Sequence, residues 1–207
     1  MGRRLGLPLV VVLKATTIVL TAVGAFGGLE RFEEKGFGWR LLWYPIAVLA
    51  LPVVWRLAAQ ARPYPYAADA LLTAPFLIDV LGNVVDFYDK IGWWDDVNHF
   101  ANWLFLSLGA GALLLRTTVG PLIAAGLVIA FGSTLVILWE LGEYMTFLRG
   151  NEEELPTAYR DTIGDMTFGL LGSLIAAGAT WYAVHRQRRH ARDTAVPPSS
   201  DLAAPAA

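Results

Sequence analysis

Six long apolar segments, separated by short polar links, dominate the pattern of the chain. They are Leu5–Phe26, Leu41–Ala59, Ala67–Val85, Val97–Leu115, Pro121–Trp139 and Ile163–Val184. Each is close to the ~20 residues that an α-helix needs to cross a bilayer. Continuous apolar runs favour helices over the alternating strands of an outer-membrane barrel. The pattern predicts an all-α fold, a bundle of six transmembrane helices, with the fifth helix continuing to Phe147.

Composition agrees with an integral membrane protein. Of the 207 residues, 56% are hydrophobic and 16% are charged, and the mean hydropathy is +0.49. Soluble domains contain about a quarter charged residues, so this chain departs far from them. The first apolar segment is longer than the roughly 7–15 residues of a signal-peptide core, and we expect it to stay in the protein as a helix.

Basic residues predict that both termini are cytoplasmic, because cytoplasmic links carry an excess of lysine and arginine. On the predicted inner side lie Arg3, Arg4, Arg56, Arg62, Arg116, Arg186, Arg188, Arg189 and Arg192. We expect a transmembrane domain over residues 1–190 and a disordered cytoplasmic tail, rich in proline and small residues, over 191–207. The basic cluster before the tail suits anionic lipid headgroups, so membrane lipids are the expected partners and nucleic acid is not.

Ionisable groups inside a bilayer cost roughly 2.5–3.5 kcal/mol each on insertion scales, so their positions are informative. The polar residues of the third and fourth segments repeat at helical spacing: Asp79, Asn83 and Asp86, then Asp95, His99 and Asn102. Lys14 lies near the middle of the first segment. We expect it to pair with Asp79, at comparable depth, rather than to extend toward the cytoplasmic headgroups.

Carboxylates also mark the last two segments. Glu140 and Glu143 end the fifth, and Asp161 and Asp165 begin the sixth. A face of small residues follows Asp165, namely Gly169, Gly172 and Ala176, and such a face lets another helix approach closely. In the predicted topology all these acids lie at the outer ends of segments three to six. If the helices bundle, they form an acidic pocket just below the outer surface.

This pocket suits a divalent cation. One imidazole with several carboxylates is a ligand set for Mg²⁺ or Mn²⁺, with Zn²⁺ and Fe²⁺ as further candidates. The expected metal ligands are His99, Glu140, Glu143, Asp161 and Asp165, and the expected catalytic residues are Asp96, His99, Glu140 and Glu143. One carboxylate would serve as a general base. Because the pocket opens at headgroup depth, the substrate would be a lipid or a cell-envelope precursor.

Other interpretations stay open. Asp96 and Asp161 also suit helix N-terminal caps, although capping does not explain Glu140 and Glu143 at a helix C-terminus. A small transporter or proton pathway would use the deeper ionisable residues, but the chain has no inverted repeat. A non-catalytic scaffold would use the acids to tie helix ends together. The sequence also leaves open whether the protein is an enzyme, and whether it is a monomer or a homodimer.

Ordered motifs resemble those of a known family. They are Tyr88-Asp89, Trp94-Asp95-Asp96-Val-Asn-His99-Phe100, Trp139-Glu140-Leu-Gly-Glu143-Tyr144, and Asp161-Thr162-Ile-Gly-Asp165 with Gly169 and Gly172 after it. Over about residues 76–180 the chain is similar to the YjdF-like small bacterial inner-membrane proteins, and more distantly to the VanZ-like membrane proteins. The resemblance implies a multi-pass protein of the bacterial cytoplasmic membrane, and it supplies no reaction.

Overall fold

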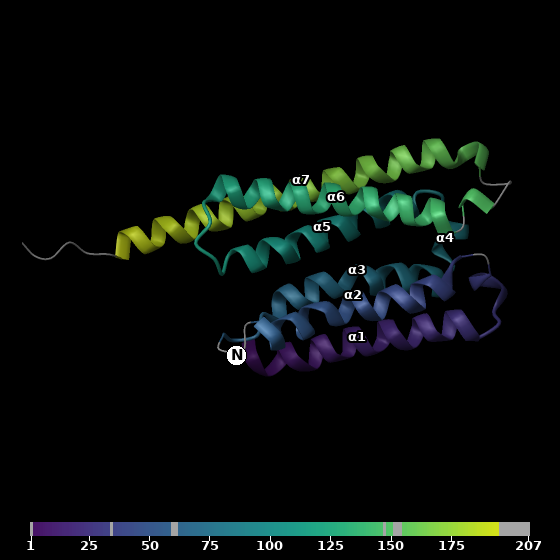
Figure 1. Ribbon diagram of the computed structural model, residues 1–207, viewed down its shortest axis with the longest axis horizontal. Helices are drawn as coiled ribbons and strands as arrows, with labels where there is room; N and C mark the ends of the chain where they lie inside the picture. The colour runs from purple at the N-terminus through teal and green to yellow at the C-terminus, as the bar shows by residue number, and fades with distance from the viewer. Residues whose placement is uncertain (1, 34, 59–61, 147, 151–154, 195–207) are drawn as a thin grey trace, which may run out of the picture.

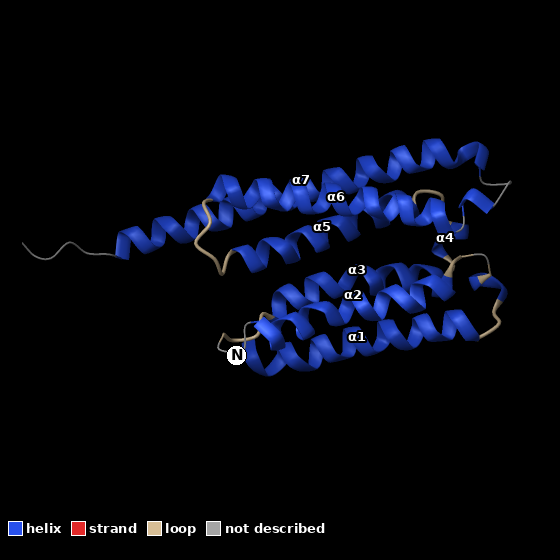
Figure 2. Cartoon of the chain, viewed as in Figure 1, coloured by secondary structure: helices blue, strands red, loops and turns tan. Residues whose placement is uncertain are grey.

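The computed structural model describes residues 2–33, 35–58, 62–146, 148–150 and 155–194. Its helices are α1 (Gly2–Phe26), α2 (Phe37–Ala58), α3 (Tyr66–Val84), α4 (Phe87–Lys90), α5 (Trp94–Leu114), α6 (Pro121–Thr146) and α7 (Leu155–Thr194), with 3₁₀ turns η1 (Glu30–Phe32) and η2 (Leu148–Gly150). Short loops join them, and the described residues include no strand (Figure 2). The predicted all-α class is confirmed.

Five helices are long and apolar enough to cross a membrane: α1, α2, α3, α6 and α7. They correspond to five of the six predicted segments. Two of the predicted limits, Ala59 of the second segment and Phe147 of the fifth, lie outside the described residues. The other predicted segment corresponds to α5, which has 21 residues but contains several polar residues in its first three turns. The sixth span and the cytoplasmic placement of both termini stay predictions.

The helices lie alongside one another along the long axis of the molecule (Figure 1). Helix α1 packs against α2 and α3, whereas α5 packs against α6 and α7. Contact between α3 and α5 joins these two groups. We call the end of the bundle that holds α4 and the α1–α2 and α6–α7 links the α4 end. In the predicted topology it faces outward.

Helix α7 is much longer than its neighbours. Its 40 residues span about 60 Å at the helical rise, twice the thickness of a hydrocarbon core. Its C-terminal part extends beyond the other helices (Figure 1), and Arg188 of the arginine-rich segment donates to the backbone oxygen of Thr118 in the α5–α6 link. Residues 191–194 of the predicted tail are therefore helical, and residues 195–207 lie outside the described part of the chain.

Small residues allow α5 and α7 to approach closely. A Cβ atom added at Gly172 would lie 2.4 Å from the backbone oxygen of Phe100, and one at Gly169 would lie 2.6 Å from a ring carbon of Trp103. Ala176 on the same face is fully buried. The predicted small-residue face is thus confirmed as a helix-packing surface, and it fixes the position of α7 against α5.

The predicted partner of Lys14 is wrong. Lys14 Nζ lies 2.7 Å from Asp69 Oδ1, and it also donates to the backbone oxygen of Val48. Gly6 of α1 lies against Tyr66 at the start of α3, so the two helices share this level. Side chains lean toward the N-terminus of their helix. The long Lys14 side chain therefore reaches back to Asp69, and Asp79 is left for another cation.

Candidate functional site

His99 lies at the centre of a polar cluster at the α4 end. It belongs to α5 and is only 7% exposed. Its Nδ1 atom lies 3.0 Å from Asp165 Oδ1 of α7 and 3.4 Å from Asp95 Oδ1 one turn earlier in α5. Nδ1 also lies 3.2 Å from the backbone oxygen of Asp95, and the three oxygens around it favour the tautomer that carries the hydrogen on Nδ1. The lone pair of Nε2 is then available on the opposite edge of the imidazole.

Two glutamates of α6 lie toward that edge. Glu140 Oε1 is 3.6 Å from His99 Nε2, and Glu143 lies one turn further along α6. Glu140 is 6% exposed, and its Oε1 has no hydrogen-bond partner among the described residues. A buried carboxylate oxygen without a partner is costly in an apolar environment. Of the described carboxylates around His99, Glu140 is the one with a buried oxygen that lacks a hydrogen-bond partner.

Two overlapping sets of side chains lie close enough together that each could hold a metal ion. One is Asp95, His99 and Asp165, and the other is His99, Glu140 and Glu143; within each set the potential ligand atoms lie within 4.8 Å of one another. Metal-binding histidines commonly donate their second N–H to a carboxylate, which orients the ring. Asp165 is placed for that role. The second set, through Nε2, is therefore the better metal-ligand set.

Further unsatisfied oxygens lie close to His99 in sequence. The buried polar atoms that lack a hydrogen-bond partner in the described chain are Thr73 Oγ1, Trp94 Nε1, Asn98 Oδ1, Asn102 Oδ1 and Glu140 Oε1. Three of these five are oxygen acceptors on α5 or α6 within one turn of His99 or opposite it. Acceptors are what a cation or its bound water molecules would satisfy.

Other predicted site residues lie apart from these sets. Asp161 is exposed, and neither it nor Asp96 belongs to either set. Asp96 packs instead near Gly164 of α7. Asn83 donates to the backbone oxygen of Asp79 within α3. Asp86 lies beyond the end of α3, in the left-handed region with φ 65°, and pairs with Lys90 at 2.9 Å.

Asp79 anchors a second polar network, which joins four helices. Arg40 Nε of α2 lies 3.1 Å from Asp79 Oδ2, and the Tyr44 hydroxyl donates to the same oxygen at 2.6 Å. The Tyr88 hydroxyl of α4 donates to Oδ1 at 2.8 Å and accepts from Asn98 Nδ2 of α5 at 2.5 Å. Burial raises the pKa of the Tyr88 hydroxyl well above its ordinary value.

Sequence reasoning missed Arg40, Tyr44 and Tyr88 as partners of Asp79. Arg40 had the appearance of an ordinary outer-link cation, although it stands one turn before Tyr44 on the same face of α2. The sequence did offer one indication of the pair, which is the energetic cost of an unpaired carboxylate in an apolar segment. Asp79 lies within the third apolar segment, where a carboxylate requires a cation, and Arg40 directly precedes the second apolar segment at its predicted outer end.

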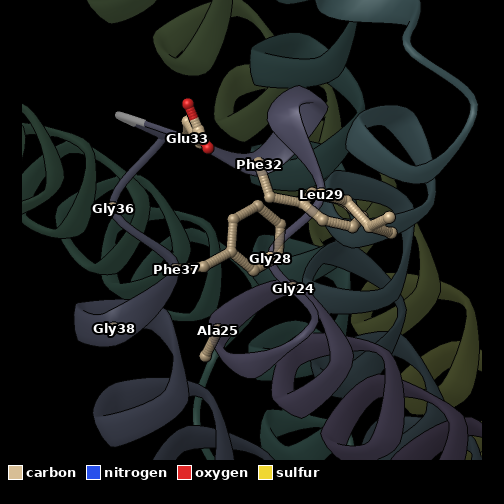
Figure 3. A pocket seen from close by; sticks show the side chains of 9 residues that line it. All are labelled: Gly24, Ala25, Gly28, Leu29, Phe32, Glu33, Gly36, Phe37 and Gly38. Atoms are coloured by element: carbon tan, nitrogen blue, oxygen red, sulfur yellow. The ribbon is translucent and has the colours of Figure 1, made fainter.

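A separate cavity lies between the end of α1 and the start of α2. Its volume is about 320 Å³, and its walls include Gly24, Leu29, Phe32, Phe37 and one ionisable residue, Glu33. The Phe32 and Phe37 rings lie beside the cavity together with the Leu29 side chain (Figure 3). None of the predicted site residues lines it, so this cavity does not supply the chemistry of the His99 cluster.

The helices and the cluster together define a multi-pass α-helical membrane protein with buried acidic and histidine side chains that could hold a metal ion. The chain belongs to the DUF2238 family of predicted membrane proteins, whose sequence model matches residues 10–188. Neither the curated proteins nor the solved structures gave a significant match.

Proposed function

We propose that this protein binds a divalent cation through His99, Glu140 and Glu143. The unpartnered, buried Oε1 atom of Glu140, which faces His99 Nε2, carries the proposal. A cation would offset the repulsion between the two glutamates and satisfy that oxygen. Asp165, bonded to the other nitrogen of the ring, would hold the imidazole in the tautomer that leaves Nε2 free.

The chemistry that such a centre supports best is Lewis-acid catalysis at headgroup depth. The cation would polarise a phosphoryl or carbonyl oxygen, or lower the pKa of a bound water molecule. Glu143 is the less buried of the two glutamate ligands, so the oxygen that it does not use for the cation would be the one to accept a proton. A lipid or cell-envelope precursor is the substrate class that could reach this level in the bilayer.

This proposal includes the membrane arrangement that it needs. In this arrangement the chain crosses the bacterial inner membrane six times, both termini are cytoplasmic, and the α4 end faces outward. The 21-residue length of α5 and its packing between α3 and α7 support the sixth span. The polar first turns of α5 face neighbouring helices through His99 and Asn98, which are both buried, so they need not contact lipid.

Metal binding by the detergent-purified full-length chain tests the proposal. The protein is titrated with Mn²⁺, and free Mn²⁺ is followed by electron paramagnetic resonance. We expect about one Mn²⁺ per chain, bound at least ~10-fold more weakly by His99→Ala and Glu140→Gln than by the unmodified protein. The matched control is His190→Ala, because His190 is an exposed histidine on the C-terminal part of α7.

Two results would reject the proposal. The unmodified protein could fail to bind Mn²⁺, or all three variants could bind it equally. If binding fails while His99→Ala still lowers the midpoint of thermal unfolding, the cluster ties α5 to α7 and the scaffold interpretation holds.

A further inference from the structure

Arg40 is a cation of the first helix group that lies beside the His99 cluster of the second. Its Nε atom is held by Asp79 at 3.1 Å and lies 3.3 Å from the Tyr44 hydroxyl. Its guanidinium carbon lies 5.3 Å from the centroid of the Phe37 ring. These three contacts fix the orientation of the side chain, so Arg40 is a preorganised group rather than a freely moving one.

Ring packing places Arg40 at the same level as Glu143. The ring centroids of Tyr44 and Trp139 are 6.4 Å apart, which brings this face of α2 next to α6. Arg40 precedes Tyr44 by one turn, and Glu143 follows Trp139 by one turn. Because α2 and α6 run in opposite directions, both steps lead toward the α4 end. Glu143 accordingly experiences the charges of both His99 and Arg40.

Only the Nε atom of the Arg40 guanidinium makes hydrogen bonds to described residues. Within the described residues, Nη1 and Nη2 of Arg40 have no hydrogen-bond partner, since its bonds are made by Nε alone. Arginine presents a planar, permanently charged fork that matches the oxygens of a phosphate group. The two Nη groups therefore offer an anion-binding edge beside the carboxylates that would hold the cation.

We infer that the site takes a phosphomonoester, whose phosphate group lies between the cation held by His99, Glu140 and Glu143 and the Nη groups of Arg40. The inference rests on the proposed cation site. Without a cation, Glu140 and Glu143 would repel a phosphate group. With it, the phosphate oxygens gain a metal contact and the arginine fork together. Phosphate and cation must then strengthen each other's binding, because coupling between two ligands is reciprocal.

The test uses the Mn²⁺-loaded full-length chain in a phosphate-free detergent, dodecyl maltoside. Two probes are added separately: inorganic phosphate and dihexanoyl phosphatidic acid, which carries the same group on a lipid. Relaxation enhancement of the ³¹P resonance reports a phosphate within reach of bound Mn²⁺. Tight binding of both probes would indicate a free phosphate compound as ligand, and binding of phosphatidic acid alone would indicate a lipid headgroup; either supports the inference.

Variants identify the part that Arg40 plays. Changing Arg40→Gln together with Asp79→Asn removes both members of the buried pair, so neither charge is left without its partner. We expect at least ~10-fold weaker phosphate binding with Mn²⁺ affinity within about twofold of the unmodified protein. Arg40→Lys keeps the charge without the fork and should fall in between. Arg149→Gln makes the same change at an exposed arginine of the α4 end and should have no effect.

The two proposals fail in different ways. Loss of Mn²⁺ binding by the unmodified protein rejects the cation site. Normal Mn²⁺ binding without any ³¹P relaxation enhancement, or with equal enhancement in the double variant, rejects the phosphate inference alone. Mn²⁺ binding is measured on each sample, so a variant that does not fold is recognised by the loss of both signals, and Arg40→Lys then decides the question.

Discussion

Replacing Gly172 by alanine should separate α5 from α7. The added Cβ would meet the backbone oxygen of Phe100 at 2.4 Å and the backbone nitrogen of Leu104 at 2.9 Å, whereas ordinary contact begins near 3.4 Å. Backbone atoms cannot rotate away, so the helices must move apart by about 1 Å. Overpacking of this kind costs about 1–3 kcal/mol. Alanine recovers about 1 kcal/mol in helix propensity, which leaves a net loss of up to about 2 kcal/mol.

Gly178→Ala is the matched control, because no atom lies within 4 Å of an added Cβ at Gly178. Only the propensity gain applies there, so this variant should be more stable by up to ~1 kcal/mol. The propensity gain is common to both alanine variants, so they should differ by the overpacking cost alone, about 1–3 kcal/mol. At roughly 2–4 °C per kcal/mol for a chain of this size, their midpoints should differ by about 2–12 °C. Circular dichroism during heating in dodecyl maltoside measures the difference.

The same separation should weaken the candidate site. The 3.0 Å bond between His99 and Asp165 joins α5 to α7, and Gly172 follows Asp165 by two turns. A shift of about 1 Å would lengthen the bond beyond the range of a hydrogen bond. We therefore expect Mn²⁺ binding to weaken in Gly172→Ala and not in Gly178→Ala. Equal unfolding midpoints for the two variants would refute the close packing of these helices.

Three further outcomes follow from the buried polar groups. Lys14→Met should cost about 3–5 kcal/mol in thermal unfolding, because it leaves the buried Asp69 carboxylate unpaired, and adding Asp69→Asn should restore most of the loss. Burial raises the pKa of the Tyr88 hydroxyl in the folded protein. The stabilisation that the neutral hydroxyl provides is therefore complete below its unfolded pKa of about 10, and it is lost as the pH rises through the folded pKa. Tyr88→Phe should accordingly flatten the fall in unfolding midpoint above about pH 10. Asp161→Asn should leave Mn²⁺ affinity within about twofold of the unmodified protein, whereas Glu140→Gln should lower it at least ~10-fold, and equal losses would show that the ligand set is wrong.

Helix positions could be predicted from the sequence because the apolar runs are long and each is bounded by polar links. The grouping of His99, Glu140, Glu143 and Asp165 could be predicted as well, because alternating helix directions bring their helix ends to one level. The structure adds the unequal roles of the acids. Asp165 contacts one nitrogen of His99, Glu140 lies toward the other, and Asp161 is exposed.

Pairing across helices could not be predicted, because it depends on the vertical offset between them. Lys14 and Asp79 were matched by counting residues from the helix ends. The true offset is set by the contact of Gly6 with Tyr66 and by the lean of the lysine side chain toward its N-terminus. A difference of nearly three turns, from Asp79 to Asp69, changes the partner. Arg40 then becomes the cation that Asp79 requires.

The two helix groups differ in how completely their buried polar side chains are paired, and this difference favours a ligand-binding role over a purely structural one. In α1–α3, the buried ionisable residues Lys14, Asp69 and Asp79 each have a described ion-pair partner. In α5 and α6, Glu140 and two asparagines keep buried oxygens without partners in the described chain, compared with one hydroxyl, that of Thr73, in the described part of α1–α3. A polar group that serves only to join helices gains nothing from an unsatisfied acceptor, which is costly in an apolar environment. An acceptor set that the fold leaves open beside a histidine is typical of a site that a cation completes.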